Sequence, residues 1–146
     1  MGNNFIEEEK SNKTGRRLAR EELFKLVFQA ELLKEDIKQI FENYLTQEKI
    51  IKNKKDLEFM KKYAEGISLS YEEIKKVISE KMENWNFERI GTVERALLIM
   101  SVYELLKEDV PHEIVVNEAV ELAKEYGDTK TYEFINGVLA KIIISK

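Results

Sequence analysis

The chain contains no cysteine among its 146 residues, and its only histidine and proline are His112 and Pro111. Without cysteine there is no disulfide, no thiolate nucleophile and no cysteine-ligated zinc or iron–sulfur centre. A single histidine also excludes a metal site built on a histidine pair. The 28 acidic residues provide carboxylate pairs by chance alone, so we assign no general acid or base. We therefore expect a binding protein that has no catalytic site and needs no cofactor.

Long apolar runs are missing as well. No window approaches the roughly 18 apolar residues of a membrane-spanning helix, and the polar segment from Met1 to Lys13 is unlike a secretory signal. The expected location is therefore the reducing cytoplasm, with no membrane partner. Apolar residues make up 43% and charged residues 36% of the chain, which is typical of one globular domain with a buried core.

Basic residues are concentrated near the N-terminus. Five of them lie between Lys10 and Arg20 with no acidic residue among them, whereas the other 19 lysines and arginines face 28 acidic residues. The rest of the chain thus has a net charge of −9, against −4 for the whole. Because salt screens charges beyond about 10 Å, such a cluster can bind phosphates on an otherwise acidic protein. The charge distribution predicts a nucleic-acid-binding segment.

The sequence predicts a succession of helices, because proline is rare and the two-residue alternation of strands is nearly absent. Residues 1–14 are expected to form a flexible tail, and residues 15–146 a single domain. The predicted helices cover residues 15–34, 36–44, 56–82, 92–106, 112–126 and 131–143. The helix over 92–106 is apolar on almost every side, which is typical of the buried centre of a bundle. The expected fold class is all-α, a compact bundle of about seven helices.

The first predicted helix combines basic and aromatic side chains. One flank of a helical wheel, beside the core face, carries Arg17, Arg20, Phe24 and Phe28. Lys13 joins this flank if the helix extends backwards, and Arg16 lies nearby at the N-terminal end. Guanidinium groups pair with phosphates and aromatic rings stack on bases, which is the chemistry that single-stranded RNA requires. A core position for Phe28 and a merely solvated arginine face are the alternatives.

Five strings, one in the first predicted helix and four beyond it, carry a further pattern. The strings are R-R-L-A-R-E (16–21), V-E-R-A-L-L (93–98), Y-E-L-L (103–106), V-N-E-A-V-E-L-A-K-E-Y-G (116–127) and F-I-N-G-V-L (134–139). Together they resemble the NusB family of bacterial transcription antitermination factors over residues 15–143. The resemblance implies seven helices in two sub-bundles. It also implies binding to boxA-type single-stranded RNA together with the ribosomal protein NusE. The RNA polymerase elongation complex is the further partner implied, with suppressed termination as the result, notably in ribosomal RNA operons.

The resemblance assigns roles to individual positions. Arg16, Arg17 and Arg20 match the arginine motif that contacts RNA in the family. Phe28 occupies a position at which the family usually carries a tyrosine implicated in RNA contact. Glu94 matches an acidic residue that faces NusE. Because Glu94 lies in the first turn of its helix, where the helix dipole stabilises a carboxylate, we expect it to need no partner within the chain.

Two positions depart from the family pattern. Leu18 stands where the family has a third consecutive arginine, which weakens the expected RNA contact. Ile99 stands where the family commonly has another arginine, so a polar contact is expected to be absent there.

Several polar residues lie in otherwise apolar helices and are expected to hydrogen-bond inside the bundle or at helix ends. Three of them are Asn117, Glu118 and Asn136. Glu104 is a fourth, and we expect it to pair with a basic group such as Arg95 or Arg89.

Two other classes of function are open at this point. NusB-like domains also occur fused before RNA cytosine methyltransferases. This chain stops shortly after F-I-N-G-V-L, which leaves no room for a catalytic domain. The other alternative is a homodimer that buries the arginine surface, in which case self-association and RNA binding compete.

Overall fold

The structure, a computed structural model, describes residues 13–83 and 86–145. The tail predicted for residues 1–14 therefore falls almost entirely outside the described residues. Within these ranges the chain forms six α-helices, one 3-10 helix and no strand, which confirms the all-α class. They are α2 (Gly15–Leu33), α3 (Ile37–Tyr44), α4 (Lys54–Glu80), η1 (Phe87–Arg89), α5 (Thr92–Lys107), α6 (His112–Tyr126) and α7 (Thr129–Ser145). Each helix in the described part of the chain is too short or too polar to span a membrane.

Side chains just before α3 and α4 fix where these helices begin. The carboxylate of Asp36 accepts the backbone N–H of Lys38 at 2.9 Å and caps α3. The side chain of Asn53 accepts the backbone N–H of Asp56 at 3.0 Å and caps α4. Helix α4 therefore begins two residues earlier than the sequence pattern indicated.

Helix α4 continues without a break through Gly66. The glycine serves the packing of α4 against α5, because a Cβ atom here would lie 2.6 Å from Cε1 of Tyr103. The Tyr103 hydroxyl donates a 2.7 Å hydrogen bond to Glu108, which holds the ring in this position. Gly66 thus allows the two helices to approach closely.

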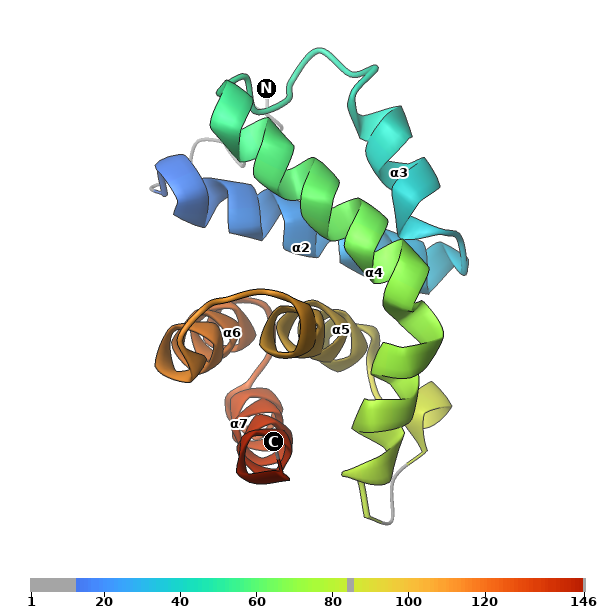
Figure 1. Cartoon of the computed structure of the whole chain (residues 1–146), viewed down its shortest axis with the longest axis vertical. Coiled ribbons are helices and arrows are strands. Elements are labelled where there is room, and N and C mark those ends of the chain that lie inside the picture. The colour runs from blue at the N-terminus through green and yellow to red at the C-terminus, as the bar shows by residue number, and fades with distance from the viewer. Residues whose placement is uncertain (1–12, 84–85, 146) are drawn as a thin grey trace.

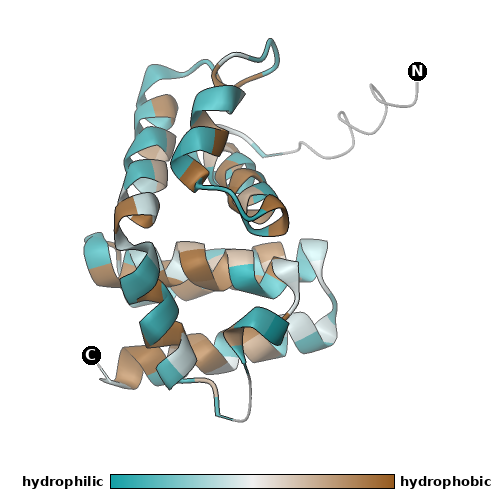
Figure 2. Cartoon of the chain, turned by 90° about the vertical axis from the view of Figure 1, so that its right-hand side faces the viewer, coloured by the Kyte–Doolittle hydropathy of each residue, from teal (hydrophilic) through white to brown (hydrophobic). Residues whose placement is uncertain are grey.

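Helix α5 is the centre of the molecule. All ten of its residues from Ala96 to Leu105 are buried, and it packs against α2, α4, α6 and α7. Figure 1 shows α2, α3 and the first half of α4 as one group, with α5, α6 and α7 as the other. In Figure 2, hydrophobic and hydrophilic segments alternate along the outer helices, as expected when each turns one face to a shared core. The predicted central helix and the two sub-bundles are confirmed.

The central position of α5 predicts a large effect of truncating Met100, whose side chain is 4% exposed. Met100→Ala is expected to lower the free energy of unfolding by about 2–5 kcal/mol, because it leaves a cavity in the core. Urea denaturation measures this change. Leu69→Ala is the control, since Leu69 is 89% exposed on α4 and should cost less than about 0.5 kcal/mol. An equally small loss for Met100→Ala would contradict the central place of α5.

Candidate nucleic-acid interface

The start of α2 presents an electropositive end to solvent. Thr14 occupies the N-cap position but makes no side-chain hydrogen bond to the helix, and the first turn contains no acidic residue. The first backbone N–H groups of the helix therefore keep their capacity to bind an anion. Arg16 and Arg17 follow directly, and both are exposed.

Arg16 is held against the start of α4. Its Nε donates to Oδ1 of Asp56 at 3.0 Å, and its guanidinium carbon lies 4.4 Å from the centre of the Phe59 ring. About half of the side chain, 51%, stays exposed. Because Asp56 engages Nε, the two terminal nitrogens of the guanidinium group are available for a phosphate.

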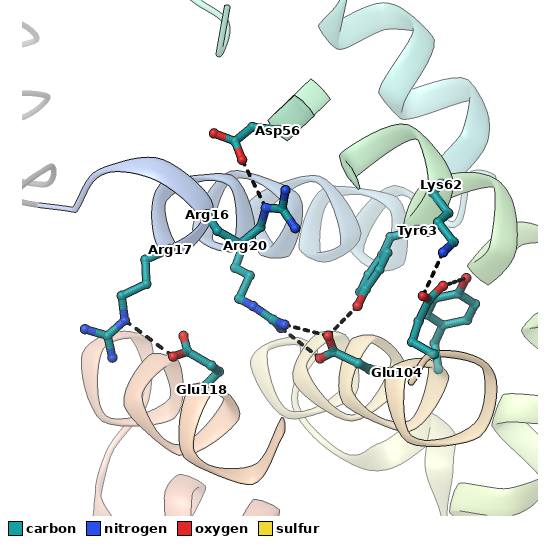
Figure 3. Close-up of polar contacts among 10 residues, drawn as sticks. Arg16, Arg17, Arg20, Asp56, Lys62, Tyr63, Glu104 and Glu118 are labelled. Atoms are coloured by element: carbon teal, nitrogen blue, oxygen red, sulfur yellow. Dashed lines mark hydrogen bonds and ion pairs between the residues drawn. The ribbon is translucent and has the colours of Figure 1, made fainter. Parts of the chain in front are cut away.

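Arg17 extends towards α6 on the other side of α2 (Figure 3). Its Nε lies 3.4 Å from Oε2 of Glu118, and 54% of its side chain is exposed. Glu118, predicted to hydrogen-bond inside the bundle or at helix ends, thus forms an ion pair with the first turn of α2 and is only 20% exposed. Arg16 and Arg17 therefore lie on opposite sides of the start of α2, and each pairs with one carboxylate while about half of its side chain stays exposed.

Lys13 lies just before α2 between two carboxylates of its own chain. Its Nζ is 3.0 Å from Oε2 of Glu21 and 2.6 Å from Oε1 of Glu125. Partial burial opposes the charge of Lys13, but the hydrogen bonds and attraction of Glu125 and Glu21 outweigh it and raise the pKa of the amine. Lys13 therefore stays charged and pairs with both carboxylates.

Arg20 is 9% exposed and therefore far more buried than Arg16 and Arg17, although it lines a small pocket together with Lys13 and Arg17. Its Nη1 and Nη2 donate to the two carboxylate oxygens of Glu104 at 2.8 Å and 2.5 Å, and the Tyr63 hydroxyl donates to the same carboxylate. Figure 3 shows this cluster between α2, α4 and α5. Burial opposes the charge of Arg20, but the hydrogen bonds and charge of Glu104 raise its pKa. The sequence pattern placed Arg20 on the RNA-facing flank, whereas in the structure its ion pair with Glu104, which also accepts from the Tyr63 hydroxyl, links α2 to α5 and α4.

The prediction that Glu104 pairs with a basic group is confirmed, but the partner is Arg20 and not Arg95 or Arg89. Arg95 instead donates from Nε to Glu31 at 3.1 Å and from Nη1 to the carbonyl of Ile90 at 2.8 Å. Arg95 and Glu104 are nine residues apart on α5, which places them on opposite sides of a helix with about 3.6 residues per turn. Helical geometry alone therefore excludes this pair.

Phe28 is partly buried and packs against the core. Its ring centre lies 6.4 Å from that of Phe24, which in turn lies 5.0 Å from the ring of Tyr126. It follows Arg17 by eleven residues, which corresponds to about 16 Å along the helix axis. The structure therefore places Phe28 on the same helix as the arginines but not beside them.

Glu94 lies in the first turn of α5, as predicted, but it has a partner within the chain. Its Oε2 accepts a 2.9 Å hydrogen bond from the hydroxyl of Thr131, a buried residue in the first turn of α7. The expectation that Glu94 needs no internal partner is therefore wrong. Its partial exposure still leaves part of the carboxylate accessible from outside.

Asn117 and Asn136 are exposed, so the prediction that they hydrogen-bond inside the bundle is also wrong. Both line a groove of about 660 Å³ between α6 and α7. In α6, Ala119 and Leu122 supply the buried face, and Asn117 lies on the opposite, polar face. An amide within an apolar string is thus no sign of burial when the helix is amphipathic.

The sequence pattern identified the arginines but missed the carboxylates that orient them. Asp56 follows Arg16 by 40 residues, and Glu104 follows Arg20 by 84 residues. No local spacing predicts such pairs, because they form only where separate helices cross.

The fold and these side chains define an all-helical protein with a basic surface at one helix end. Compared with known protein families, residues 16–143 match the NusB family. The transcription antitermination protein NusB of Fusobacterium nucleatum is 50% identical over 152 aligned positions, which cover 100% of this chain and 99% of that protein. The chain belongs to the NusB family.

Solved structures agree with this assignment. NusB of T. maritima has a TM-score of 0.78 and 37% identity, covering 89% of this chain and 91% of that one. A crystal structure of the antitermination factors NusB and NusE in complex with double-stranded RNA contains a chain with a TM-score of 0.74 and 32% identity. The match covers 90% of this chain and 97% of that one.

Proposed function

We propose that this chain is a transcription antitermination factor that binds boxA-type single-stranded RNA together with NusE, and that it works in the cytoplasm without catalysing a reaction. The bound complex then joins the RNA polymerase elongation complex and suppresses termination, notably in ribosomal RNA operons. The observation that carries the proposal is the pair of half-exposed arginines, Arg16 and Arg17, at the uncapped start of α2 in a NusB-family chain.

The energetics of the ion pairs favour Arg16 and Arg17 as the phosphate contacts. Exposed ion pairs contribute about 0–1 kcal/mol, so a phosphate can displace Glu118 from the half-exposed Arg17 at little cost. At Arg16 a phosphate can bind the terminal nitrogens while Nε stays on Asp56. Breaking a buried pair costs about 3–5 kcal/mol, which removes Arg20 from the available contacts. In this proposal Arg20 is a positioning residue that orients the first turns of α2.

Lys13 and Phe28 complete the proposed RNA surface. The charge of Lys13 attracts phosphates near the start of α2, although its own ion pairs limit direct contact. The partly exposed ring of Phe28 offers a stacking surface for a base further along the strand. RNA is thus expected to follow α2 from its N-terminus towards its middle.

A titration with RNA tests this function. Binding of boxA-like and scrambled RNA is measured at several salt concentrations, with and without NusE. The proposal predicts tighter binding to boxA-like RNA and a further gain when NusE is present. Equal affinity for both RNAs under every condition would contradict the antitermination function.

Glu94 is proposed to face NusE, and Glu94→Lys is the variant that tests this. NusE is a ribosomal protein and is expected to be basic, and juxtaposed like charges at an interface cost several kcal/mol. Calorimetry should therefore show strongly weakened NusE binding. RNA binding by the variant alone should stay close to that of the wild type, because the proposed RNA surface lies on α2.

The hydrogen bond from Thr131 requires a matched control for this variant. Loss of the acceptor is expected to cost about 0.5–1.5 kcal/mol of stability. Glu94→Gln removes the charge but keeps an oxygen that accepts from Thr131, so its melting temperature should match the wild type. Unchanged NusE affinity in Glu94→Lys would remove Glu94 from the interface.

A further inference from the structure

The connection between α3 and α4 carries a second group of basic residues. Residues 49–55 read K-I-I-K-N-K-K, with four lysines and no acidic residue. Lys52, Lys54 and Lys55 are all exposed. None of the three makes an ion pair with another described residue, in contrast to Lys13, Arg16, Arg17 and Arg20. We call Lys52, Lys54 and Lys55 the lysine ridge.

The backbone that carries the lysine ridge is anchored to the fold. The Ile51 N–H donates a 2.9 Å hydrogen bond to the Tyr44 hydroxyl, and the side chains of Ile50 and Ile51 pack against the core. Asn53 caps α4 through its hydrogen bond to the Asp56 N–H. Figure 2 accordingly colours most of this connection hydrophilic, with a short apolar stretch within it. The ridge therefore presents its charges from a fixed surface, at a low entropic cost of ordering.

The lysine ridge lies beside the start of α2. The ion pair between Arg16 and Asp56 joins the first turns of α2 and α4, and Lys55 directly precedes Asp56 in sequence. A hollow of about 700 Å³ separates the two elements, with Gly15 on one wall and Lys52 on the other. Figure 1 shows these two helix starts side by side.

The acidic residues around this hollow are already engaged by basic partners. Glu22 lies 3.3 Å from Lys25, Asp56 pairs with Arg16, and Glu21 pairs with Lys13. The lysine ridge therefore supplies the uncompensated charge on this side of the hollow. An RNA strand that is bound at Arg16 and runs towards this hollow therefore meets the positive charge of the lysine ridge next.

We propose that the lysine ridge is a second phosphate-binding surface, which extends the arginine site of α2 and holds the sugar–phosphate backbone of the same RNA strand. This inference rests on the proposed RNA-binding function. Lysine ammonium groups act as point charges without a fixed fork, so they suit phosphates at variable positions and do not read bases. The adjacent isoleucines pack inwards, which leaves a surface that is charged and not apolar.

The variant Lys52→Gln/Lys54→Gln/Lys55→Gln tests the lysine ridge in the full chain. Binding is measured against a short boxA-like RNA and against the same RNA lengthened at its 5′ or its 3′ end. At about 0.7 per phosphate contact on a single strand, the slope of log affinity against log salt should fall by about 2 for one lengthened RNA. Affinity and slope for the short RNA should match the wild type.

The control variant is Lys38→Gln/Lys76→Gln/Lys130→Gln, which removes the same charge from exposed positions on α3, α4 and α7. It should leave the slope for every RNA within error of the wild type. Equal losses of slope in the two triple variants would indicate a general charge effect and would contradict phosphate binding by the lysine ridge. If the wild type binds the RNAs but the ridge variant keeps the wild-type slope, phosphate binding by the lysine ridge is contradicted, while the proposed function stands. Failure of the wild type to bind any of these RNAs would overturn the proposed function itself.

Discussion

Glu104→Ala is expected to destabilise the fold by about 3–5 kcal/mol, the loss typical of a buried ion pair that is broken on one side. The substitution leaves the guanidinium group of Arg20 without its partner at a position where Arg20 is 9% exposed. It also removes the acceptor of the Tyr63 hydroxyl. Urea denaturation followed by circular dichroism measures the change.

The matched control replaces the whole cluster with apolar residues. In Arg20→Met/Glu104→Leu/Tyr63→Phe no buried polar group loses its partner, so the cost should be far smaller than for Glu104→Ala. Comparison of the two variants separates the penalty of an unpaired charge from the loss of packing. A loss below about 1 kcal/mol in Glu104→Ala would contradict the role of this cluster in joining α2, α4 and α5.

Arg16→Gln/Arg17→Gln is expected to remove the main phosphate contacts while the fold stays intact. Two contacts at about 0.7 each predict that the slope of log affinity against log salt falls by about 1.4. Stability should fall by no more than about 1–3 kcal/mol, because both arginines are half exposed but the loss of Arg16 leaves the buried carboxylate of Asp56 without this hydrogen bond. Fluorescence titrations of boxA-like RNA across a salt series provide the slopes.

Lysine substitutions provide the control for this pair. Arg16→Lys/Arg17→Lys keeps both charges, so the salt slope should stay near the wild-type value. Affinity should still fall, because lysine lacks the planar fork that engages a phosphate through two nitrogens. If Arg16→Gln/Arg17→Gln retained the wild-type slope, the phosphate contacts would have to lie elsewhere on the chain.

The helices could be predicted from sequence because their signals are local. The apolar residues of α5 follow one another along the chain, and Asp36 caps α3 from the position directly before it. Predicted boundaries agree with the structure to within two residues, including the end of α6 before Gly127. Such features depend on neighbours in sequence, so one sequence is enough to reveal them.

The polar contacts could not be predicted in the same way. Arg20 and Arg16 have similar sequence surroundings, yet one is buried and the other exposed. What separates them is the crossing of α2 with α5, which brings Glu104 to Arg20 across 84 residues. The same limit applies to Glu94, whose partner Thr131 lies on another helix.

NMR of the arginine side chains during an RNA titration tests the central claim most directly. The Nε–H signals of Arg16, Arg17 and Arg20 are assigned through single Arg→Lys variants and followed as boxA-type RNA is added. We predict that the signals of Arg16 and Arg17 shift, because RNA phosphates bind at these two guanidinium groups, while that of Arg20 stays in place. A shift of the Arg20 signal, with those of Arg16 and Arg17 unchanged, would contradict the account.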